Sequence, residues 1–334
     1  MAVRVAVNGF GRIGRLVFRH LMKNDNLEVV AVNDIASLDN LLYLLKYDSV
    51  QRDPEEEIQQ NGDGFRYKGR QVRFTSERDP AQLPWKEWGV EIVVESTGFF
   101  TQREGAAKHL EAGAKRVIIS APAKNEDITI CLGVNEDQYD PDQHYIISNA
   151  SCTTNCLSPV AKVLDAEFGI ESGLLTTIHA YTSSQALVDS PKKKWRRGRA
   201  AALSIVPTTT GAAIATTKVL PQLAGKMNGM AIRVPVPAGS IIDFTVHTRK
   251  PLSVESVNQA LSEAAKTDRL NGILGVTTEK LVSADIVGSG FSSLVDLNST
   301  MVVGEYDVKV LAWYDNEWGY SKRCADLAAY IAKA

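Results

Sequence analysis

The stretch Val3-Arg4-Val5-Ala6-Val7-Asn8-Gly9-Phe10-Gly11-Arg12-Ile13-Gly14 decides the fold of this chain. Its apolar start predicts a short strand, and its glycines predict a tight turn. A helix-compatible segment at residues 15–23 and a second apolar strand at residues 27–32 come next, and Asp34 stands 20 residues after Gly14. Strand, glycine turn, helix, strand and acidic residue in this order form the dinucleotide-binding fingerprint.

Each residue of the fingerprint has a physical reason to be there. Gly9 allows the tight turn, Gly11 lets the backbone approach a pyrophosphate, and Gly14 permits close packing of helix on strand. The pyrophosphate then lies at a helix N-terminus, where backbone N–H groups and the helix dipole favour anions. Asp34 accepts hydrogen bonds from ribose hydroxyls and repels a 2′-phosphate, so the pattern favours NAD over NADP. A glycine motif alone is often only a turn, and here its context supports the functional reading.

Two further strands fit the same parallel sheet. Residues 90–95 lead into Thr97 and Gly98, and residues 116–119 lead into Ser120. Ligands of doubly wound sheets bind beyond the carboxyl ends of the strands, so these loops are predicted to lie near a nicotinamide ribose. Without the fingerprint, plain loop hydroxyls would explain both side chains equally well. The charged segment 51–78 is predicted to be a hairpin-like excursion.

The second half of the chain has a different pattern. Longer strands are predicted at residues 173–178, 231–235, 241–248 and 308–314, with helices at 211–220 and 253–266. This indicates a mixed, largely antiparallel sheet covered by helices. We predict an α/β Rossmann dinucleotide-binding domain at 1–150, completed by a C-terminal helix at 316–334, and an α+β catalytic domain at 151–315.

A reactive cysteine is predicted in Ser151-Cys152-Thr153-Thr154-Asn155-Cys156. The thiolate is the nucleophilic form of cysteine, so the thiol needs a base or a positive setting. Cys152 lies just before a predicted helix, read from residues 159–164, and Ser151 is a suitable N-cap. His179 ends the strand at 173–178, which could return it to the thiol. Cys156 is predicted to be a buried apolar residue rather than a redox partner.

Several residues after His179 suit an anionic substrate. Thr182, Arg197, Arg233 and the helix start Thr210-Gly211 offer hydroxyls, guanidinium groups and backbone N–H donors. Taken singly, the arginines could be solvated surface charges and the threonines a cap. The basic run at residues 192–199 could in isolation bind nucleic acid.

Composition sets the remaining limits. The 334 residues carry a net charge of −2, which gives no global electrostatic case for nucleic acid or membrane. Four cysteines are too few for a disulfide framework and suggest a reducing compartment. The N-terminus enters a strand without a leader sequence, and no apolar run is long enough to span a bilayer, so we predict a cytoplasmic protein. We predict no metal site.

Together these motifs resemble the phosphorylating glyceraldehyde-3-phosphate dehydrogenases, from residue 3 to about residue 330. The motifs that carry the resemblance are Asn8-Gly9-Phe10-Gly11-Arg12-Ile13-Gly14-Arg15, Ser148-Asn149-Ala150-Ser151-Cys152-Thr153-Thr154-Asn155-Cys156, His179-Ala180-Tyr181-Thr182, Pro207-Thr208-Thr209-Thr210-Gly211-Ala212-Ala213 and Trp313-Tyr314-Asp315-Asn316-Glu317-Trp318-Gly319-Tyr320. The resemblance implies that Cys152 attacks the aldehyde of glyceraldehyde 3-phosphate and that His179 promotes thiolate formation and accepts a proton. Hydride passes to NAD, and phosphate cleaves the resulting thioester to 1,3-bisphosphoglycerate.

The resemblance also implies binding residues and an assembly. Cofactor contacts map to Arg12, Ile13, Asp34, Arg78, Ser120 and Asn316. The phosphates of substrate and acyl acceptor map to Ser151, Thr182, Arg197, Thr210, Gly211 and Arg233, and we add Thr153 to this set. The usual assembly is a homotetramer with the loop from about residue 181 to 210 at its centre.

The chain departs from the family pattern mainly in that loop. Ser190-Pro191 stands where Leu-Pro marks NAD-preferring members, so NADP use stays open although Asp34 argues for NAD. An erythrose-4-phosphate dehydrogenase is the enzymatic alternative, and Thr182 favours the glyceraldehyde-phosphate type. A binding protein that uses the basic run at 192–199 on RNA or on a partner is the alternative from another class, and the intact catalytic motifs argue against it.

Overall fold

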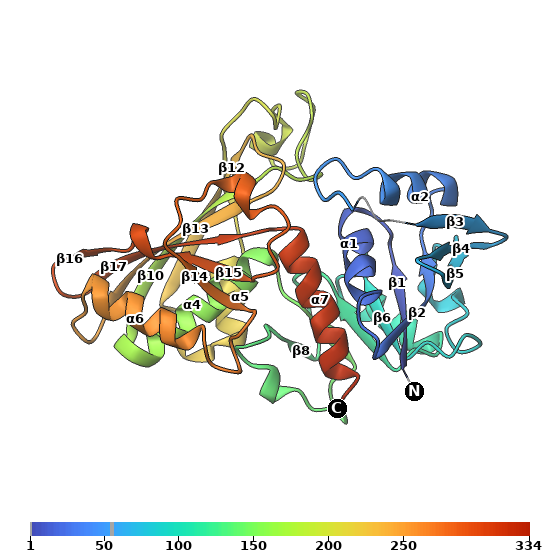
Figure 1. Ribbon diagram of the computed structural model, residues 1–334, viewed down its shortest axis with the longest axis horizontal. Coiled ribbons are helices and arrows are strands. Elements are labelled where there is room, and N and C mark those ends of the chain that lie inside the picture. Colours follow the sequence, from blue (N-terminus) through green and yellow to red (C-terminus); the bar gives the residue numbers. More distant parts are fainter. Residues whose placement is uncertain (1, 54–56) are drawn as a thin grey trace. The chain divides into compact units, whose positions relative to one another are not determined.

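The computed structural model describes residues 2–53 and 57–334. Met1 and residues 54–56, which belong to the predicted first domain and in part to the predicted excursion, lie outside the described residues. The chain forms two compact units, shown in Figure 1. Unit 1 comprises Met1–Ile130, Asp137–Ala150 and Ser321–Ala334, and unit 2 comprises Cys131–Glu136 and Ser151–Tyr320.

Unit 1 contains a mostly parallel sheet in the order β3-β4-β5-β2-β1-β6-β7-β9-β8. Its strands are β1 (Val3–Asn8), β2 (Leu27–Asn33), β3 (Ile58–Asn61), β4 (Gly64–Tyr67), β5 (Arg70–Thr75), β6 (Ile92–Glu95), β7 (Arg116–Ile119), β8 (Ile128–Thr129) and β9 (Ile146–Ser148). Its helices are α1 (Arg12–Leu21), α2 (Leu38–Lys46) and α3 (Arg103–Glu111). The buried, β-branched strands at its centre are typical of a parallel sheet covered on both faces.

The order of the strands creates the place where a ligand can bind. β1 pairs in parallel with β2 on one side and with β6 on the other, as Figure 1 shows. The chain therefore leaves β1 in one direction through α1 and later returns to its other side. This is the topological switch point of a doubly wound sheet, and ligands of such sheets bind beyond the strand ends there.

The predicted excursion forms two hairpins on the edge of this sheet. β3 pairs antiparallel with β4, and β4 pairs antiparallel with β5. β5 then joins β2 in parallel. The excursion ends at Arg78, beside the carboxyl end of β2, so its last residues lie at the switch point.

Unit 2 contains the mixed, largely antiparallel sheet that the sequence predicts, in the order β11-β12-β10-β13-β17-β15-β14, with β16 paired to β17. Its strands are β10 (Ile170–Ala180), β11 (Val206–Thr209), β12 (Met227–Val234), β13 (Ser240–Thr248), β14 (Leu274–Thr277), β15 (Ser293–Asp296), β16 (Met301–Val303) and β17 (Asp307–Tyr314). Its helices are α4 (Cys152–Phe168), α5 (Ala212–Val219) and α6 (Val254–Ala264). α4 packs on β10, β13, β15 and β17 and contacts both α5 and α6, and Figure 1 shows the three helices together on one face of the sheet.

The last helix, α7 (Trp318–Ile331), ends in unit 1. Cys324, Leu327 and Ala328 on it are fully buried. Asn149 donates to the Cys324 sulfur over 3.1 Å, and the rings of Tyr139 and Tyr330 meet edge to face. In the part of the chain that the structure describes, no helix has both the length and the apolar character of a membrane span.

Candidate active site

The glycine turn between β1 and α1 has the geometry that the fingerprint predicts. Gly9 has a φ of +88°, and a Cβ there would lie 2.5 Å from the backbone nitrogen of Thr97. A Cβ on Gly14 would lie 1.9 Å from the carbonyl oxygen of Gly9. Around a Cβ on Gly11, by contrast, no atom of the described residues lies within 4 Å apart from Gly11 itself and its two neighbours in the chain. Gly9 and Gly14 are thus required for packing, whereas Gly11 leaves open space in front of the helix N-terminus.

A pocket of about 420 Å³ opens at the switch point of unit 1. It is lined by residues at the carboxyl ends of β1, β2 and β6 and at the end of the β3–β5 excursion. They are Asn8, Gly9, Gly11, Asn33, Asp34, Ile35, Glu77, Arg78, Ser96, Thr97, Phe99 and Phe100. The volume is within the usual range for a small-molecule site.

The carboxylate of Asp34 is held at this pocket by backbone donors. One oxygen accepts from the Phe10 N–H over 2.7 Å, and the other accepts from the Ala36 N–H over 2.9 Å. These bonds fix a negative charge beside the glycine turn. The open space at Gly11, the fixed carboxylate and the pocket together fit the adenosine and pyrophosphate groups of a dinucleotide that lacks a 2′-phosphate.

The other predicted cofactor residues of unit 1 are only partly brought together. Arg78 and Thr97 line the pocket, whereas Arg12 and Ile13 lie in the first turn of α1 outside its lining. The Arg12 guanidinium forms an ion pair with Asp48. Burial works to raise the pKa of Asp48, but hydrogen bonds from Arg12 and from backbone N–H groups outweigh it, and the pKa is lowered.

Ser120 and Asn316 lie elsewhere. The hydroxyl of Ser120, at the end of β7, donates to the Glu95 carbonyl oxygen over 3.1 Å and contacts the Ser96 hydroxyl at 3.0 Å. Asn316 belongs to unit 2, where its side-chain oxygen accepts from the Ser240 hydroxyl over 2.8 Å. This bond leaves the amide NH₂ of Asn316 as the group that faces away from Ser240.

Three linked polar residues, of which Asn8 and Asn33 line the pocket, were missed from the sequence. Asn8, Asn33 and Glu95 are the last residues of β1, β2 and β6, and each is at most 3% exposed. Their side chains are joined by hydrogen bonds, with 2.5 Å between Asn8 and Glu95 and 2.7 Å between Asn33 and Asn8. A polar residue that ends each of three otherwise apolar strands is the signal that could have found them.

The predicted thiol–imidazole pair is assembled within unit 2. Cys152 is the first residue of α4, so the prediction that it precedes the helix is wrong by one position. Ser151 is the N-cap, as predicted, and accepts from the Thr154 N–H over 3.1 Å. His179 lies near the end of β10, and its Nε2 is 3.4 Å from the Cys152 sulfur. The helix begins at residue 152, directly after the Ser151 cap, and Pro159 lies inside it.

The imidazole of His179 has two competing partners at Nδ1. The Ala180 carbonyl oxygen lies 2.7 Å away, and Arg233 Nη1 lies 2.8 Å away. With a proton on Nδ1 the ring donates to the carbonyl, and the Nε2 lone pair faces the thiol. Without that proton Nδ1 accepts from Arg233, and an N–H on Nε2 faces the sulfur. Both tautomers therefore have a partner, which suits a group that takes a proton and returns it.

Burial and a cation set the charges of this pair. Burial, followed by the nearby Arg233 guanidinium, lowers the pKa of His179 to about 3, so its ring is neutral at rest. Burial raises the pKa of the Cys152 thiol, and the charge of Arg233 opposes that rise. Burial also raises the pKa of Cys156, which is fully buried and contacts Ser293. Of these two thiols only Cys152 has both partial exposure and a base.

A second cluster brings Arg197 and Thr182 together. Arg197 donates to the Thr208 hydroxyl over 3.0 Å and to the Ser184 hydroxyl over 3.4 Å. Ser184 lies 2.8 Å from the Thr182 hydroxyl and so links the two predicted residues. The charge of Arg197 also lowers the pKa of His179, after burial and Arg233, so this cluster acts electrostatically on the thiol–imidazole pair.

The remaining predicted phosphate residues lie at helix starts. Gly211 is the exposed N-cap of α5, and the Thr210 hydroxyl accepts from the Ala212 N–H over 3.2 Å. The hydroxyl of Thr153 lies 2.8 Å from the buried Tyr314 hydroxyl. The ring of Tyr314 also packs edge to face on His179, with 5.8 Å between their centres, so Tyr314 is a further residue of the site.

Comparison with known proteins now decides the family. The family described as "Glyceraldehyde 3-phosphate dehydrogenase, NAD binding domain" matches residues 3–103, and "Glyceraldehyde 3-phosphate dehydrogenase, C-terminal domain" matches residues 151–316. The chain belongs to the glyceraldehyde-3-phosphate dehydrogenase family. It is 59% identical over 332 residues to the glyceraldehyde-3-phosphate dehydrogenase of Geobacillus stearothermophilus, with 99% of each chain covered.

Two further relatives give the same result. The glyceraldehyde-3-phosphate dehydrogenase of Priestia megaterium is 58% identical over 332 residues, with 99% of each chain covered. Glyceraldehyde-3-phosphate dehydrogenase 1 of Bacillus subtilis is 57% identical over 333 residues, covering 100% of this chain and 99% of its own. The resemblance read from the sequence is therefore confirmed, as are the predicted fold class, the enzyme class of NAD-dependent oxidoreductase and the cofactor NAD.

Proposed function

We propose that this glyceraldehyde-3-phosphate dehydrogenase family member oxidises and phosphorylates the aldehyde of glyceraldehyde 3-phosphate, giving 1,3-bisphosphoglycerate. The observation that carries the proposal is the 3.4 Å contact between the Cys152 sulfur and His179 Nε2 at the start of α4. A neutral imidazole beside a thiol at a helix N-terminus is suited to thiolate formation. Bound NAD supplies a hydride acceptor.

The chemistry assigned to this pair has two halves. In the first, the thiol proton passes to Nε2, the sulfur adds to the aldehyde carbon, and the same proton then moves from Nε2 to the former aldehyde oxygen. This gives a thiohemiacetal on Cys152 and a neutral His179 ring. Loss of hydride from that carbon and of the hydroxyl proton to His179 leaves a thioester. In the second half, an oxygen of inorganic phosphate attacks the thioester carbon and the sulfur leaves. The proton that His179 accepted returns to the sulfur, so the products are the acyl phosphate and the free Cys152 thiol beside a neutral His179.

The anions of both halves need cations and hydroxyls beside the thiol. We assign the substrate phosphate to Thr182 and Arg233 and the attacking phosphate to Ser151, Thr210 and Gly211. Arg197 and Thr153 complete this set, Thr153 through its backbone N–H because its hydroxyl is engaged with Tyr314. Support comes from the electrostatic effect of Arg233 and Arg197 on His179.

For the cofactor we assign the pocket residues Asp34, Arg78 and Thr97, together with Arg12, Ile13, Ser120 and Asn316. We propose domains at 1–150 with 316–334, which bind NAD, and at 151–315, which bind substrate. The fixed carboxylate of Asp34 supports NAD rather than NADP, whereas the exposed Ser190 leaves NADP to be tested. A homotetramer in the cytoplasm that binds neither nucleic acid nor membrane completes the proposal.

The deciding experiment follows NADH formation with glyceraldehyde 3-phosphate, with and without inorganic phosphate. NADP and erythrose 4-phosphate replace NAD and substrate in parallel reactions. Strong phosphate-dependent turnover with NAD supports the proposal. Turnover that is indifferent to phosphate would overturn the assignment of Thr210 and Gly211, and a preference for erythrose 4-phosphate would overturn the substrate.

A further inference from the structure

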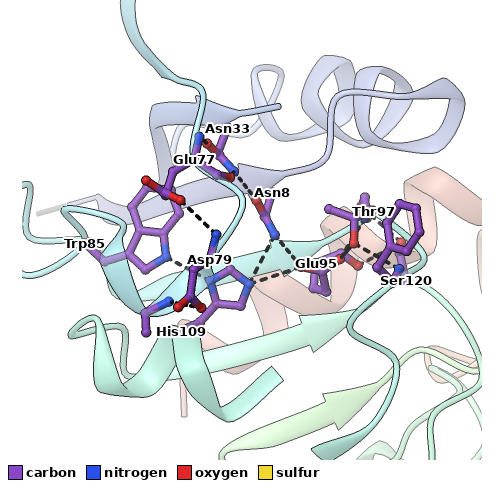
Figure 2. Close-up of polar contacts among 12 residues, drawn as sticks. Asn8, Asn33, Glu77, Asp79, Trp85, Glu95, Thr97, His109 and Ser120 are labelled. Carbon is purple, nitrogen blue, oxygen red and sulfur yellow. Dashed lines mark hydrogen bonds and ion pairs between the residues drawn. The ribbon is translucent and has the colours of Figure 1, made fainter. Parts of the chain in front are cut away.

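Beneath the dinucleotide pocket lies a buried polar chain that the proposed chemistry does not use. It runs from the Trp85 indole through the His109 ring to the Glu95 carboxylate and on to Thr97, as Figure 2 shows. The side chains of Glu95 and His109 have no exposed surface, and Trp85 is fully buried. Buried polar groups need a reason because each has lost its water.

The position of the proton on His109 follows from its neighbour Trp85, whose indole N–H can donate but not accept. The Trp85 indole N–H can only donate, and it lies 2.9 Å from His109 Nδ1. Nδ1 therefore carries no proton, so the neutral ring has its proton on Nε2. That N–H faces an oxygen of Glu95 over 3.1 Å. His109 is thus a donor to Glu95.

The same reasoning applies from the opposite side of the chain. The Glu77 backbone N–H donates to the Asn33 side-chain oxygen over 2.9 Å, so the Asn33 amide NH₂ is the group that faces Asn8. Asn8 consequently accepts with its oxygen and presents its own NH₂ to Glu95 over 2.5 Å. Figure 2 shows Asn8 and His109 meeting the carboxylate together.

All partners of Glu95 are therefore donors. Asn8 and His109 donate to one oxygen, and the backbone N–H and the hydroxyl of Thr97 donate to the other. An amide in its place would turn an NH₂ toward one of these donors. Accepting from all four therefore requires a side chain with two acceptor oxygens, which the carboxylate supplies.

This requirement decides what Thr97 can offer to a ligand. Its N–H and its hydroxyl hydrogen are both directed to Glu95, and one of its two oxygen lone pairs accepts from the Phe99 N–H over 3.1 Å. One acceptor position remains on a residue that lines the pocket. Pyrophosphate oxygens only accept hydrogen bonds, so they find no partner in Thr97.

We propose that Glu95 is a positioning residue that makes Thr97 an acceptor-only contact of the dinucleotide pocket, so that Thr97 binds a donor group of the ligand, a ribose hydroxyl, and not the pyrophosphate. The proposal rests on the proposed function insofar as the ligand is NAD. The pyrophosphate must then be held by other groups, and the N-terminus of α1 behind Gly11 is suited to an anion.

The binding test measures dissociation constants by calorimetry for NAD and for NAD analogues that each lack one ribose hydroxyl. Thr97→Val, which removes only the hydroxyl, should weaken NAD binding about tenfold, and Thr97→Ser should bind within about twofold of the parent. One analogue should bind the parent about tenfold more weakly than NAD but lose nothing further with Thr97→Val. The proposal would be overturned if Thr97→Val bound NAD as tightly as the parent protein does. It would also be overturned if Thr97→Val weakened the binding of every analogue by the same factor as the binding of NAD.

The positioning role of Glu95 is tested by a compensating pair. Glu95→Gln presents an NH₂ to a donor in either orientation, so it should weaken NAD binding and lower the melting temperature. Adding Trp85→Phe to the Glu95→Gln variant frees Nδ1 of His109, so the ring can move its proton there and accept from the new NH₂ with Nε2. The double variant should regain part of the lost NAD affinity and part of the lost melting temperature. Trp88→Phe removes a neighbouring indole that is not part of the buried polar network, so it should restore neither the affinity nor the melting temperature. Equal behaviour of the two tryptophan variants would overturn the role of Glu95.

A spectroscopic measurement separates the positioning role of Glu95 from a general loosening of the fold. Nitrogen NMR of the parent protein should show His109 with a proton on Nε2 and none on Nδ1, and Trp85→Phe should change that pattern. The opposite tautomer in the parent would overturn the proton assignment. A parent protein that binds no NAD at all would instead overturn the proposed function, so the two failures can be told apart.

Discussion

Two glycines at the start of α1 should respond differently to an added methyl group, Gly14 by losing stability and Gly11 by losing NAD affinity. At Gly14 a Cβ would lie 1.9 Å from the Gly9 carbonyl oxygen, whereas ordinary contact begins near 3.4 Å, so helix and strand must separate by roughly 1.5 Å. The obstacle is backbone and cannot rotate away, which puts the cost of Gly14→Ala at the upper end of overpacking, about 3 kcal/mol. For a unit of this size that is a fall in melting temperature of about 6–12 °C.

Gly11→Ala is the matched control. Gly11 has a φ of −70° and a ψ of −159°, which alanine adopts without strain, and its Cβ position is open. Stability should stay level or rise by about 0.4–1 kcal/mol, because the unfolded chain loses freedom. The methyl group then occupies space that we assign to the ligand, so NAD affinity should fall between about fivefold and a hundredfold.

Melting by calorimetry and NAD titration on both variants check this reasoning. Gly14→Ala should lose stability, and Gly11→Ala should lose affinity at full stability. A Gly14→Ala protein that melts within about 2 °C of the parent would refute the packing role. Equal losses of stability and affinity in Gly11→Ala would refute the assignment of the open space to a ligand.

Three further predictions concern charges. Arg233→Gln removes the cation that opposes the raised pKa of Cys152, so the pH midpoint for alkylation of Cys152 by iodoacetamide should move upward; an unmoved midpoint, or labelling of Cys156 in its place, would contradict this. In the folded protein His179 is neutral because its pKa is lowered to about 3, whereas in the unfolded chain it binds a proton below about pH 6.5. As the pH is lowered from 6.5 toward 3, the free energy of unfolding should therefore decrease by up to about 1.4 kcal/mol per pH unit. Denaturant titrations should show a shallower fall for His179→Asn, and identical slopes would contradict the neutral ring. Asp34→Asn removes the charge held at the pocket, so the ratio of NADP to NAD affinity should rise about tenfold or more in parallel titrations, and a constant ratio would contradict that role.

The local parts of the fold could be predicted from the sequence. The fingerprint depends on steric needs of single residues, and the Cβ distances at Gly9 and Gly14 agree with the reasons for which glycine was expected there. The N-cap role of Ser151 is equally local, since its hydroxyl bonds the backbone three residues later. Patterns of this kind depend on near neighbours in the chain and therefore remain visible without a structure.

Contacts between distant segments could not be read in the same way. The link between Asn8 and Glu95 joins residues 87 positions apart, and the link from Trp85 to His109 crosses between a loop and α3. The first turns of α4 were left out of the predicted helix at residues 159–164, although Ser151 was expected as its N-cap and the helix begins at Cys152. No role was predicted for Ser184, although its hydroxyl joins Thr182 to Arg197.

The threading of the chain has a consequence for its synthesis. Unit 1 contains the earliest segment of the chain and also Ser321–Ala334, whereas nearly all of unit 2 lies between them. During translation the parallel sheet emerges first, yet the buried positions that receive Cys324 and Leu327 stay open until the last helix leaves the ribosome. Unit 2, with the thiol and its base, can complete its own sheet while unit 1 still lacks the segment Ser321–Ala334. A chaperone that shields the waiting surface would therefore act on the half of the protein that was made first.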